Sequence, residues 1–314
     1  SNLPSTEVHA LVSDDTAELA EYCPWIDQVV RDPGPEAGVE GMRSLVKTLR
    51  SERYAAAIAL HPEIRTGPVL WGARIPSRMA PTTNISLVFY THRLRQRRSR
   101  SVKPEFEYNQ DLVLHFLKSR GIRPDHSVPR PYLWFPAEEV ARLRRDFIRK
   151  YGIPDDHRLI FIHAGSGGSA HNLSLAQYIR LGTAISARQD CTLVLTAGPG
   201  EHETAQAAVD ALRAQSQPAV RYCSEKGLLN FARHLAFVDV FISGSTGPLH
   251  IAGALNRPTA GFYSRRRVSS SLRWQTLNEA GRRLGFSPPE SAPETDMASI
   301  NMDAAAREIV DRLL

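Results

Sequence analysis

The sequence predicts an α/β fold in which parallel strands alternate with helices. Short apolar stretches, such as residues 55–60 and 159–163, have the length and composition of buried strands. Between them lie segments whose apolar residues recur at helical spacing, as at positions 42, 45, 46 and 49. Gly-rich stretches follow several of the strands, where the chain turns into its next helix. This alternation favours parallel sheets that helices cover on both faces.

The length of the chain predicts two domains, because 314 residues exceed the roughly 250 at which a single core stops growing. The composition changes over residues 124–157, where a Pro-rich stretch precedes a charged amphipathic helix and a turn. We therefore expect an N-terminal domain over residues 1–153 and a C-terminal domain over residues 154–314.

Each domain has its own set of expected elements. In the first, strands are expected at 8–13, 26–30, 55–60 and 77–79, and helices at 15–21, 38–51, 63–71 and 107–121. In the second, strands are expected at 159–163, 192–196, 220–222, 238–243 and 259–263, and helices at 175–187, 201–214, 228–235, 249–255 and 304–314.

Composition and charge restrict the class of protein. Hydrophobic residues at 42% and charged residues at 23% are ordinary globular values, and no apolar run approaches the roughly 18 residues of a membrane span. Three cysteines without paired spacing argue against a disulfide framework and a structural zinc site, and they favour a cytoplasmic location. The first residues lack the features of a signal peptide. The formal charge of +6 favours anionic partners.

The stretch FISGSTGPLHIAGALNRP (241–258) runs from a buried strand through two glycines into a helix. Ser245 or Thr246 is expected to cap that helix, Pro248 suits its start, and Gly247 lies beside its first N–H groups. Such a helix end binds anions, and His250 would lie in its first turn. The alternative is that His250 only packs and that the glycines only shape a turn.

A second Gly-rich loop begins at Gly165 and leads to a helix with the capping-box residues Ser174 and Gln177. Its glycines allow backbone amides to approach a phosphate closely. The loop lacks the Gly-Lys-Ser/Thr ending of a P-loop, and Gly165, Gly167 and Ala170 meet only a looser form of the dinucleotide fingerprint. A flexible connection without a ligand is the alternative. Two such loops in one domain favour a single diphosphate site.

A third connection, LTAGPGEHETAQ (195–206), carries Glu201, His202 and Glu203 at the start of a helix. A carboxylate there could accept hydrogen bonds from the hydroxyls of a ligand. The alternative is that these carboxylates only add favourable charge near the positive end of the helix dipole.

Three segments together resemble the C-terminal domain of glycosyltransferase family 9, the ADP-heptose:lipopolysaccharide heptosyltransferases. They are FIHAGSGGSAHNLSLAQY (161–178), VLTAGPGEHE (194–203) and DVFISGSTGPLHIAGALNRPTAGFY (239–263). The resemblance is strong over about residues 155–275 and weak over the N-terminal half. It implies two Rossmann-like domains facing across a cleft (GT-B type), with the donor on the second. It also implies inverting transfer of heptose from an ADP-linked donor to the lipopolysaccharide inner core, at the inner face of the inner membrane, without a metal or a cofactor.

The resemblance also implies roles for individual residues. Donor phosphates would contact the loop that begins at Gly165, through Gly165, Ser166, Gly167, Gly168 and His171. The ribose hydroxyls would bind Glu203, and the adenine would lie beside the segment from Lys226 to Leu228. The diphosphate would be surrounded by Ser245, Thr246, Gly247 and His250.

The sequence departs from the family pattern in three places. His171 stands where many members have lysine, and Ser245 where members have aspartate, which leaves the sugar of the donor open. The family begins with a strand, a helix and an aspartate usually assigned as the general base that an inverting transfer needs. The sequence starts after that point, so we expect a truncated or divergent first domain and identify no general base.

The basic stretch HRLRQRRSRSVK (92–103) carries five arginines within eight residues. Under the resemblance, Arg97, Arg98 and Arg100 would bind the phosphates of an anionic glycolipid acceptor. A second basic cluster at 264–274 could serve the same acceptor. A solvated loop is the alternative. Nucleic acid is not an expected partner, because no aromatic interleaving or known motif accompanies the arginines.

The residues also leave two other functions open. One is a nucleotide-binding module of the same fold without catalytic activity, which the missing base would suit. The other, weaker, is a dinucleotide-dependent oxidoreductase, in which Asp190 would be the acidic fingerprint residue although it precedes a strand rather than ending one.

Overall fold

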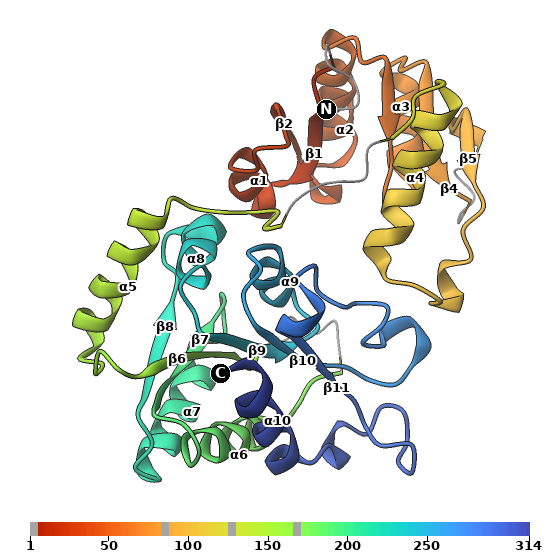
Figure 1. Cartoon of the computed structure of the whole chain (residues 1–314). Coiled ribbons are helices and arrows are strands. Elements are labelled where there is room, and N and C mark those ends of the chain that lie inside the picture. Colours follow the sequence, from red (N-terminus) through yellow and green to blue (C-terminus); the bar gives the residue numbers. More distant parts are fainter. Residues whose placement is uncertain (1–5, 83–87, 125–129, 166–170) are drawn as a thin grey trace. The chain divides into compact units, whose positions relative to one another are not determined.

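The computed structural model describes residues 6–82, 88–124, 130–165 and 171–314. The chain forms two compact units, residues 1–127 and 128–314, each an α/β assembly with parallel strands (Figure 1). The division falls earlier than the boundary expected near residue 154, because helix α5 (Ala137–Tyr151) packs on the second unit. The ring of its Phe147 lies 5.6 Å from that of Phe161 and 5.5 Å from that of Phe237, centroid to centroid.

The first unit contains two parallel sheets among its described residues, with strand orders β1–β2 and β3–β4–β5. Its elements are β1 (His9–Ser13), α1 (Asp14–Glu21), β2 (Gln28–Asp32), α2 (Gly38–Ser51), β3 (Ala56–Ile58), α3 (Thr66–Gly72), β4 (Ser77–Pro81), β5 (His92–Leu94) and α4 (Glu105–Ser119). Helix α2 has the predicted bounds, and its Leu45 and Leu49 are buried in the core of the unit. Strand β5 was not predicted, because its three residues begin the basic stretch.

The second unit is built on one six-stranded parallel sheet with the order β11–β10–β9–β6–β7–β8. After α5 come β6 (Arg158–His163), α6 (Leu175–Ser186), β7 (Cys191–Ala197), α7 (His202–Ala214), β8 (Ala219–Cys223), α8 (Gly227–Leu235), β9 (Val240–Gly244), α9 (Gly247–Ala254), β10 (Thr259–Phe262), β11 (Arg283–Phe286) and α10 (Met302–Leu313). Every predicted strand of this unit is present. The edge strand β11 was not predicted, because four residues without clear alternation give little signal.

Helices cover both faces of this sheet, as the continuous apolar strands require. Ile160 and Ile162 of β6 belong to one core with α6, α7 and α10, which lie together below the sheet in Figure 1. Phe161 points to the opposite face, where its ring meets those of Phe147 from α5 and Phe237. The sheet from which the loops at the carboxyl ends of the strands begin is therefore packed on both faces.

Candidate functional site

The two Gly-rich connections and the one that carries Glu201 begin at the same edge of the second unit's sheet. The strand register places His163, the last residue of β6, opposite Thr196 of β7 and Ser243 of β9. Because the three strands run parallel, the loops that follow them leave the sheet side by side. The prediction that these loops share one sheet edge is confirmed.

Glu201 fills the space between the loop that begins at Gly165 and its own loop, which follows β7. A methyl group added to Gly165 would lie 1.9 Å from the Glu201 Oε1 atom, so the backbone and the carboxylate touch only because residue 165 is glycine. The Gly198 N–H donates a hydrogen bond of 2.8 Å to Glu201 Oε2. Glu203, the glutamate that the resemblance favoured, lies exposed in the first turn of α7. The carboxylate at the first loop is therefore that of Glu201.

His163 supports this carboxylate from within the sheet. Its side chain is buried, its Nδ1 lies 3.1 Å from Thr196 Oγ1, and its Nε2 lies 3.7 Å from Glu201 Oε2. Burial lowers the pKa of His163, and the negative charge of Glu201 opposes that shift only in part. The imidazole is therefore neutral near pH 7, and it places a polar edge beside Glu201 without adding a full charge.

Asn172 ties the first loop to the end of β9. Its side-chain amide donates to the Ala164 carbonyl at 2.9 Å, and its Oδ1 accepts the hydroxyl of buried Tyr178 at 2.7 Å. A methyl group on Gly244, the last residue of β9, would lie 2.6 Å from this Oδ1. Asn172 and His163 were not predicted as site residues, although Asn172 ends the Gly/Ser loop and His163 ends the strand before it. The capping box predicted at Ser174 is confirmed.

The start of α9 offers one exposed backbone donor, the N–H of Gly247, at the same edge. Thr246 is the N-cap residue, but its side chain makes no capping hydrogen bond. Its Oγ1 lies 3.0 Å from Ser243 Oγ instead, which corrects the expectation that Ser245 or Thr246 caps the helix. Gly247 is exposed, and a methyl group added there would touch nothing within 4 Å. The N–H of Gly247 is therefore accessible to an anion, whereas Pro248 has no N–H, Leu249 is buried and the His250 N–H donates to the Thr246 carbonyl.

His250 lies one turn into α9, as predicted. Its ring meets the Trp274 ring edge-on, with centroids 6.3 Å apart and an interplanar angle of 67°. Burial lowers its pKa, so the imidazole is neutral near pH 7. Within the described residues its ring nitrogens make no hydrogen bond, and this leaves them free for a ligand at the helix end.

The remaining predicted donor residues lie along the same edge or outside the described ranges. Ser166, Gly167 and Gly168 fall outside the described residues. His171 is exposed where the described chain resumes, and Ser245 is half-buried between β9 and α9. Lys226 and Leu228 flank the start of α8, after β8, the outer neighbour of β7. The sheet therefore brings these described positions to one edge.

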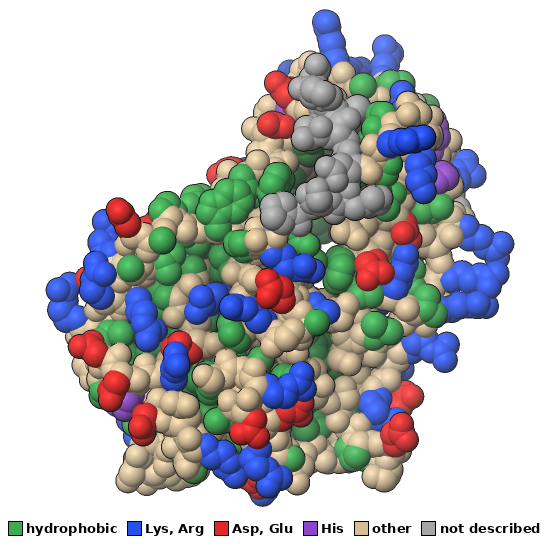
Figure 2. Space-filling model, viewed as in Figure 1, with side chains coloured by type: hydrophobic (Ala, Val, Ile, Leu, Met, Phe, Trp, Pro, Cys, Tyr) green, Lys and Arg blue, Asp and Glu red, His purple; other side chains and the backbone are tan. Residues whose placement is uncertain are grey.

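The arginine cluster of the first unit is divided by burial. Arg97 and Arg100 are exposed, and Figure 2 shows blue side chains gathered over the segment between β5 and α4. Arg98 is buried, donates to Gln96 Oε1 at 2.9 Å and pairs with Glu105. Arg98 therefore stabilises its own unit, in contrast to the expectation that all three arginines face an acceptor.

Within the described residues no group of three or more His, Cys, Asp or Glu side chains could hold a metal ion. None of the helices in the described part of the chain is long and apolar enough to cross a bilayer.

Comparison with known proteins gives consistent matches. The model of Glycosyltransferase family 9 (heptosyltransferase) matches residues 42–301. A Haemophilus influenzae protein named "Putative glycosyltransferase" is 40% identical over 307 residues, which cover 98% of this chain and 88% of that protein. E. coli ADP-heptose lipopolysaccharide heptosyltransferase II superposes with a TM-score of 0.75 at 18% identity, covering 99% of this chain and 90% of that one. E. coli heptosyltransferase WaaC with ADP gives 0.70 at 14% identity, covering 99% and 91%. These likenesses confirm the predicted α/β fold class of the GT-B type.

Proposed function

The chain belongs to glycosyltransferase family 9, and we propose that it transfers heptose from an ADP-linked donor to a lipopolysaccharide inner-core acceptor, with inversion at the anomeric carbon. Membership of the family makes the chain a glycosyltransferase, and the donor, the sugar and the acceptor are the proposed part. The observation that carries the proposal is the convergence of Glu201, the open end of α9 and His250 on one sheet edge.

The second unit is the proposed donor-binding unit. The diphosphate would lie against the Gly247 N–H at the start of α9, where the helix dipole favours negative charge, and against the backbone at Gly165. We assign the ribose hydroxyls to Glu201 rather than to Glu203, because Glu201 is the carboxylate beside the first loop. The adenine would lie along α8, near Leu228.

The same groups suit the departure of ADP in the reaction. As the acceptor hydroxyl attacks the anomeric carbon and a base takes its proton, the bond from that carbon to the diphosphate breaks and negative charge grows on the leaving oxygen. The exposed N–H of Gly247, already fixed at the start of α9, would stabilise that charge without rearrangement. His250, neutral beforehand, can donate a hydrogen bond to the same oxygens.

The first unit is the proposed acceptor unit. Its exposed Arg97 and Arg100 carry fixed charges that suit the phosphates of a glycolipid core. Such an acceptor is embedded in a membrane, so we propose that the protein acts in the cytoplasm at the inner face of the inner membrane. The fit of two exposed arginines to phosphate supports this assignment. Arg98 is not proposed to bind the acceptor, because it is buried.

Titration calorimetry of the chain with ADP, UDP and NAD tests the donor site first. ADP is expected to bind most tightly. Its affinity is expected to fall at least about tenfold in His250→Ala and in Glu201→Gln, because each variant loses one charged or charge-assisted hydrogen bond. Glu203→Gln is the matched control and is expected to bind ADP as the parent does. A preference for UDP or NAD would contradict the proposed donor.

A transfer assay with ADP-heptose and a core acceptor tests the reaction itself. The double variant Arg97→Gln/Arg100→Gln is expected to raise the KM for the acceptor and to leave ADP affinity unchanged. Equal loss of both affinities would contradict the assignment of the arginines. Binding of ADP without any turnover by the full-length protein would identify a nucleotide-binding module instead.

A further inference from the structure

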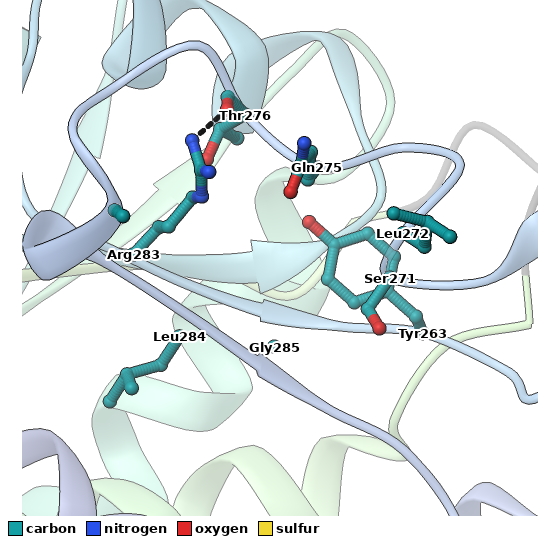
Figure 3. Close-up of a pocket in the computed structure, with 9 residues that line it drawn as sticks. Tyr263, Ser271, Leu272, Gln275, Thr276, Arg283, Leu284 and Gly285 are labelled. Carbon is teal, nitrogen blue, oxygen red and sulfur yellow. Dashed lines mark hydrogen bonds between the residues drawn. The ribbon is translucent and has the colours of Figure 1, made fainter. Parts of the chain in front are cut away.

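A polar hollow lies between β10, β11 and the loop that joins them. Its volume is about 250 Å³, and its wall includes Tyr263, Ser271, Gln275, Thr276 and Arg283. Figure 3 shows Arg283 and Thr276 together on one side, and Tyr263, Ser271, Leu272 and Gln275 on the other. A hollow of this size can hold a molecule as large as a monosaccharide derivative.

Two glycines make room for the side chains of Tyr263 and Ser271, which form part of the wall of the hollow. Gly261 of β10 and Gly285 of β11 are paired in register, and the ring of Tyr263 lies over them. A methyl group on Gly261 would lie 2.5 Å from the Tyr263 ring, and one on Gly285 would lie 3.0 Å from Ser271 Cβ. The positions of Tyr263 and Ser271 in the wall of the hollow therefore depend on the absence of both side chains. The Tyr263 hydroxyl donates to the Trp274 carbonyl at 3.3 Å, which leaves its oxygen able to accept a hydrogen bond.

The charge of the lining is positive and is not balanced by a carboxylate. Arg283 is the charged residue among those that line the hollow, and no Asp or Glu accompanies it there. Burial lowers the pKa of Arg283, and the nearby positive charge of Arg130 lowers it further. The guanidinium is therefore a cation in an unfavourable place, which a bound anion would stabilise.

Hydrogen-bond donors are available on several sides. Nη1 of Arg283 donates to the carbonyls of Thr276 and Asn278, at 3.1 Å and 2.6 Å, and this fixes the plane of the guanidinium. Its Nε and Nη2, and the side chains of Gln275 and Ser271, make no hydrogen bond to any described residue. A fixed guanidinium with two free donors, across the hollow from an amide and a hydroxyl, is suited to a phosphate or carboxylate group.

We propose that this hollow binds the oxyanion of a small polyhydroxylated molecule, with Arg283 as its charge partner and Gln275 and Ser271 as its hydrogen-bond partners. The site is separate from the proposed donor site and does not depend on the proposed function. The two lie close, because Trp274 accepts from Tyr263 at the hollow and contacts His250 in α9.

The test titrates the full chain with glucose 6-phosphate, with glucuronate and, as the uncharged control, with glucose, in the presence of saturating ADP. At least one anionic probe is expected to bind, and the stronger of the two identifies phosphate or carboxylate as the preferred group. Glucose is expected to bind at least about tenfold more weakly, because it lacks the charged partner for Arg283.

Three variants locate the bound probe. Arg283→Gln removes the charge, and Gln275→Glu adds a repelling carboxylate while leaving the carbonyl bonds of Arg283 in place. Each is expected to weaken the anionic probe at least about tenfold, whereas Arg267→Gln, an equal loss of charge at an exposed position of the same loop, is expected to leave it unchanged. Should Arg283→Gln unfold the chain, Gln275→Glu decides alone.

Three results would overturn the proposal. They are equal binding of glucose, unchanged affinity in the Gln275→Glu variant, and no binding of either anionic probe at tens of millimolar. If ADP fails to bind, the proposed donor site fails, and the comparison of variants without ADP still decides whether the hollow binds an oxyanion.

Discussion

Gly165→Ala tests the contact that joins the first two loops of the candidate site. The added methyl group would lie 1.9 Å from Oε1 of Glu201 and 2.3 Å from its Oε2, closer than non-bonded atoms can approach. The carboxylate is the mobile end of the side chain, so it is expected to swing away rather than displace the backbone. It then loses the N–H of Gly198, which it accepts at 2.8 Å.

The size of the effect follows from that lost bond. A hydrogen bond to a charged group contributes about 1.5–3 kcal/mol, and the side chain of Glu201 is 25% exposed, so solvent reduces the loss to about 1 kcal/mol. For a unit of this length such a loss lowers Tm by about 2–4 °C. If Glu201 binds the ribose, as proposed, ADP affinity falls about tenfold as well.

A double-mutant cycle separates this mechanism from general damage to the loop. Tm and ADP affinity are measured for Gly165→Ala, for Glu201→Ala and for the two combined. In the Glu201→Ala background the added methyl group meets no carboxylate, so Gly165→Ala is expected to cost nothing further. Gly281→Ala, where a methyl group touches nothing within 4 Å, is the control for glycine replacement. An equal cost of Gly165→Ala in both backgrounds would refute the reasoning.

Three further predictions concern stability. Tyr178→Phe removes the hydroxyl that donates to the part-buried Oδ1 of Asn172, which keeps the Leu173 N–H as a donor, and is expected to cost about 1 kcal/mol in thermal unfolding. The control Tyr151→Phe is expected to cost nothing measurable. Arg98→Ala breaks a buried ion pair and is expected to lower the free energy of unfolding by about 3 kcal/mol. Arg97→Ala, at an exposed position, should change it by less than about 0.5 kcal/mol. Equal costs of the two substitutions would contradict the division of the arginine cluster into buried and exposed members. Burial lowers the pKa of His234, so its contribution is fully present above about pH 6.5 and is lost as pH falls, by up to about 1.4 kcal/mol per pH unit. Unfolding curves from pH 7.5 to 5 should be less steep in pH for His234→Gln, and a parallel decline would contradict this.

The sequence alone identified the fold class and the edge of the sheet that carries the site. Apolar strands and amphipathic helices depend on spacing along the chain, which a sequence displays directly, as for helix α2 at residues 38–51. The loops that begin at Gly165 and at Ser245 were recognised because glycines after buried strands mark a change of direction. In parallel α/β folds such loops gather at the carboxyl edge, so their proximity also followed from the sequence.

Tertiary structure decided which side chains occupy that edge. Glu201 and Glu203 lie two residues apart at the start of one helix, and the resemblance favoured Glu203. Only the close approach of Gly165 showed that Glu201 is the one beside the loop that begins at Gly165. Arg97 and Arg98 are neighbours in the same basic stretch and were given the same role from the sequence. Only the folded structure showed that Arg98 is buried, in an ion pair with Glu105. Strand β11 has no clear pattern of its own and became a strand by pairing with β10. Periodicity reports which face of an element is apolar, whereas burial and hydrogen bonding of one polar side chain depend on neighbours that are distant in sequence, and the folded chain alone brings those together.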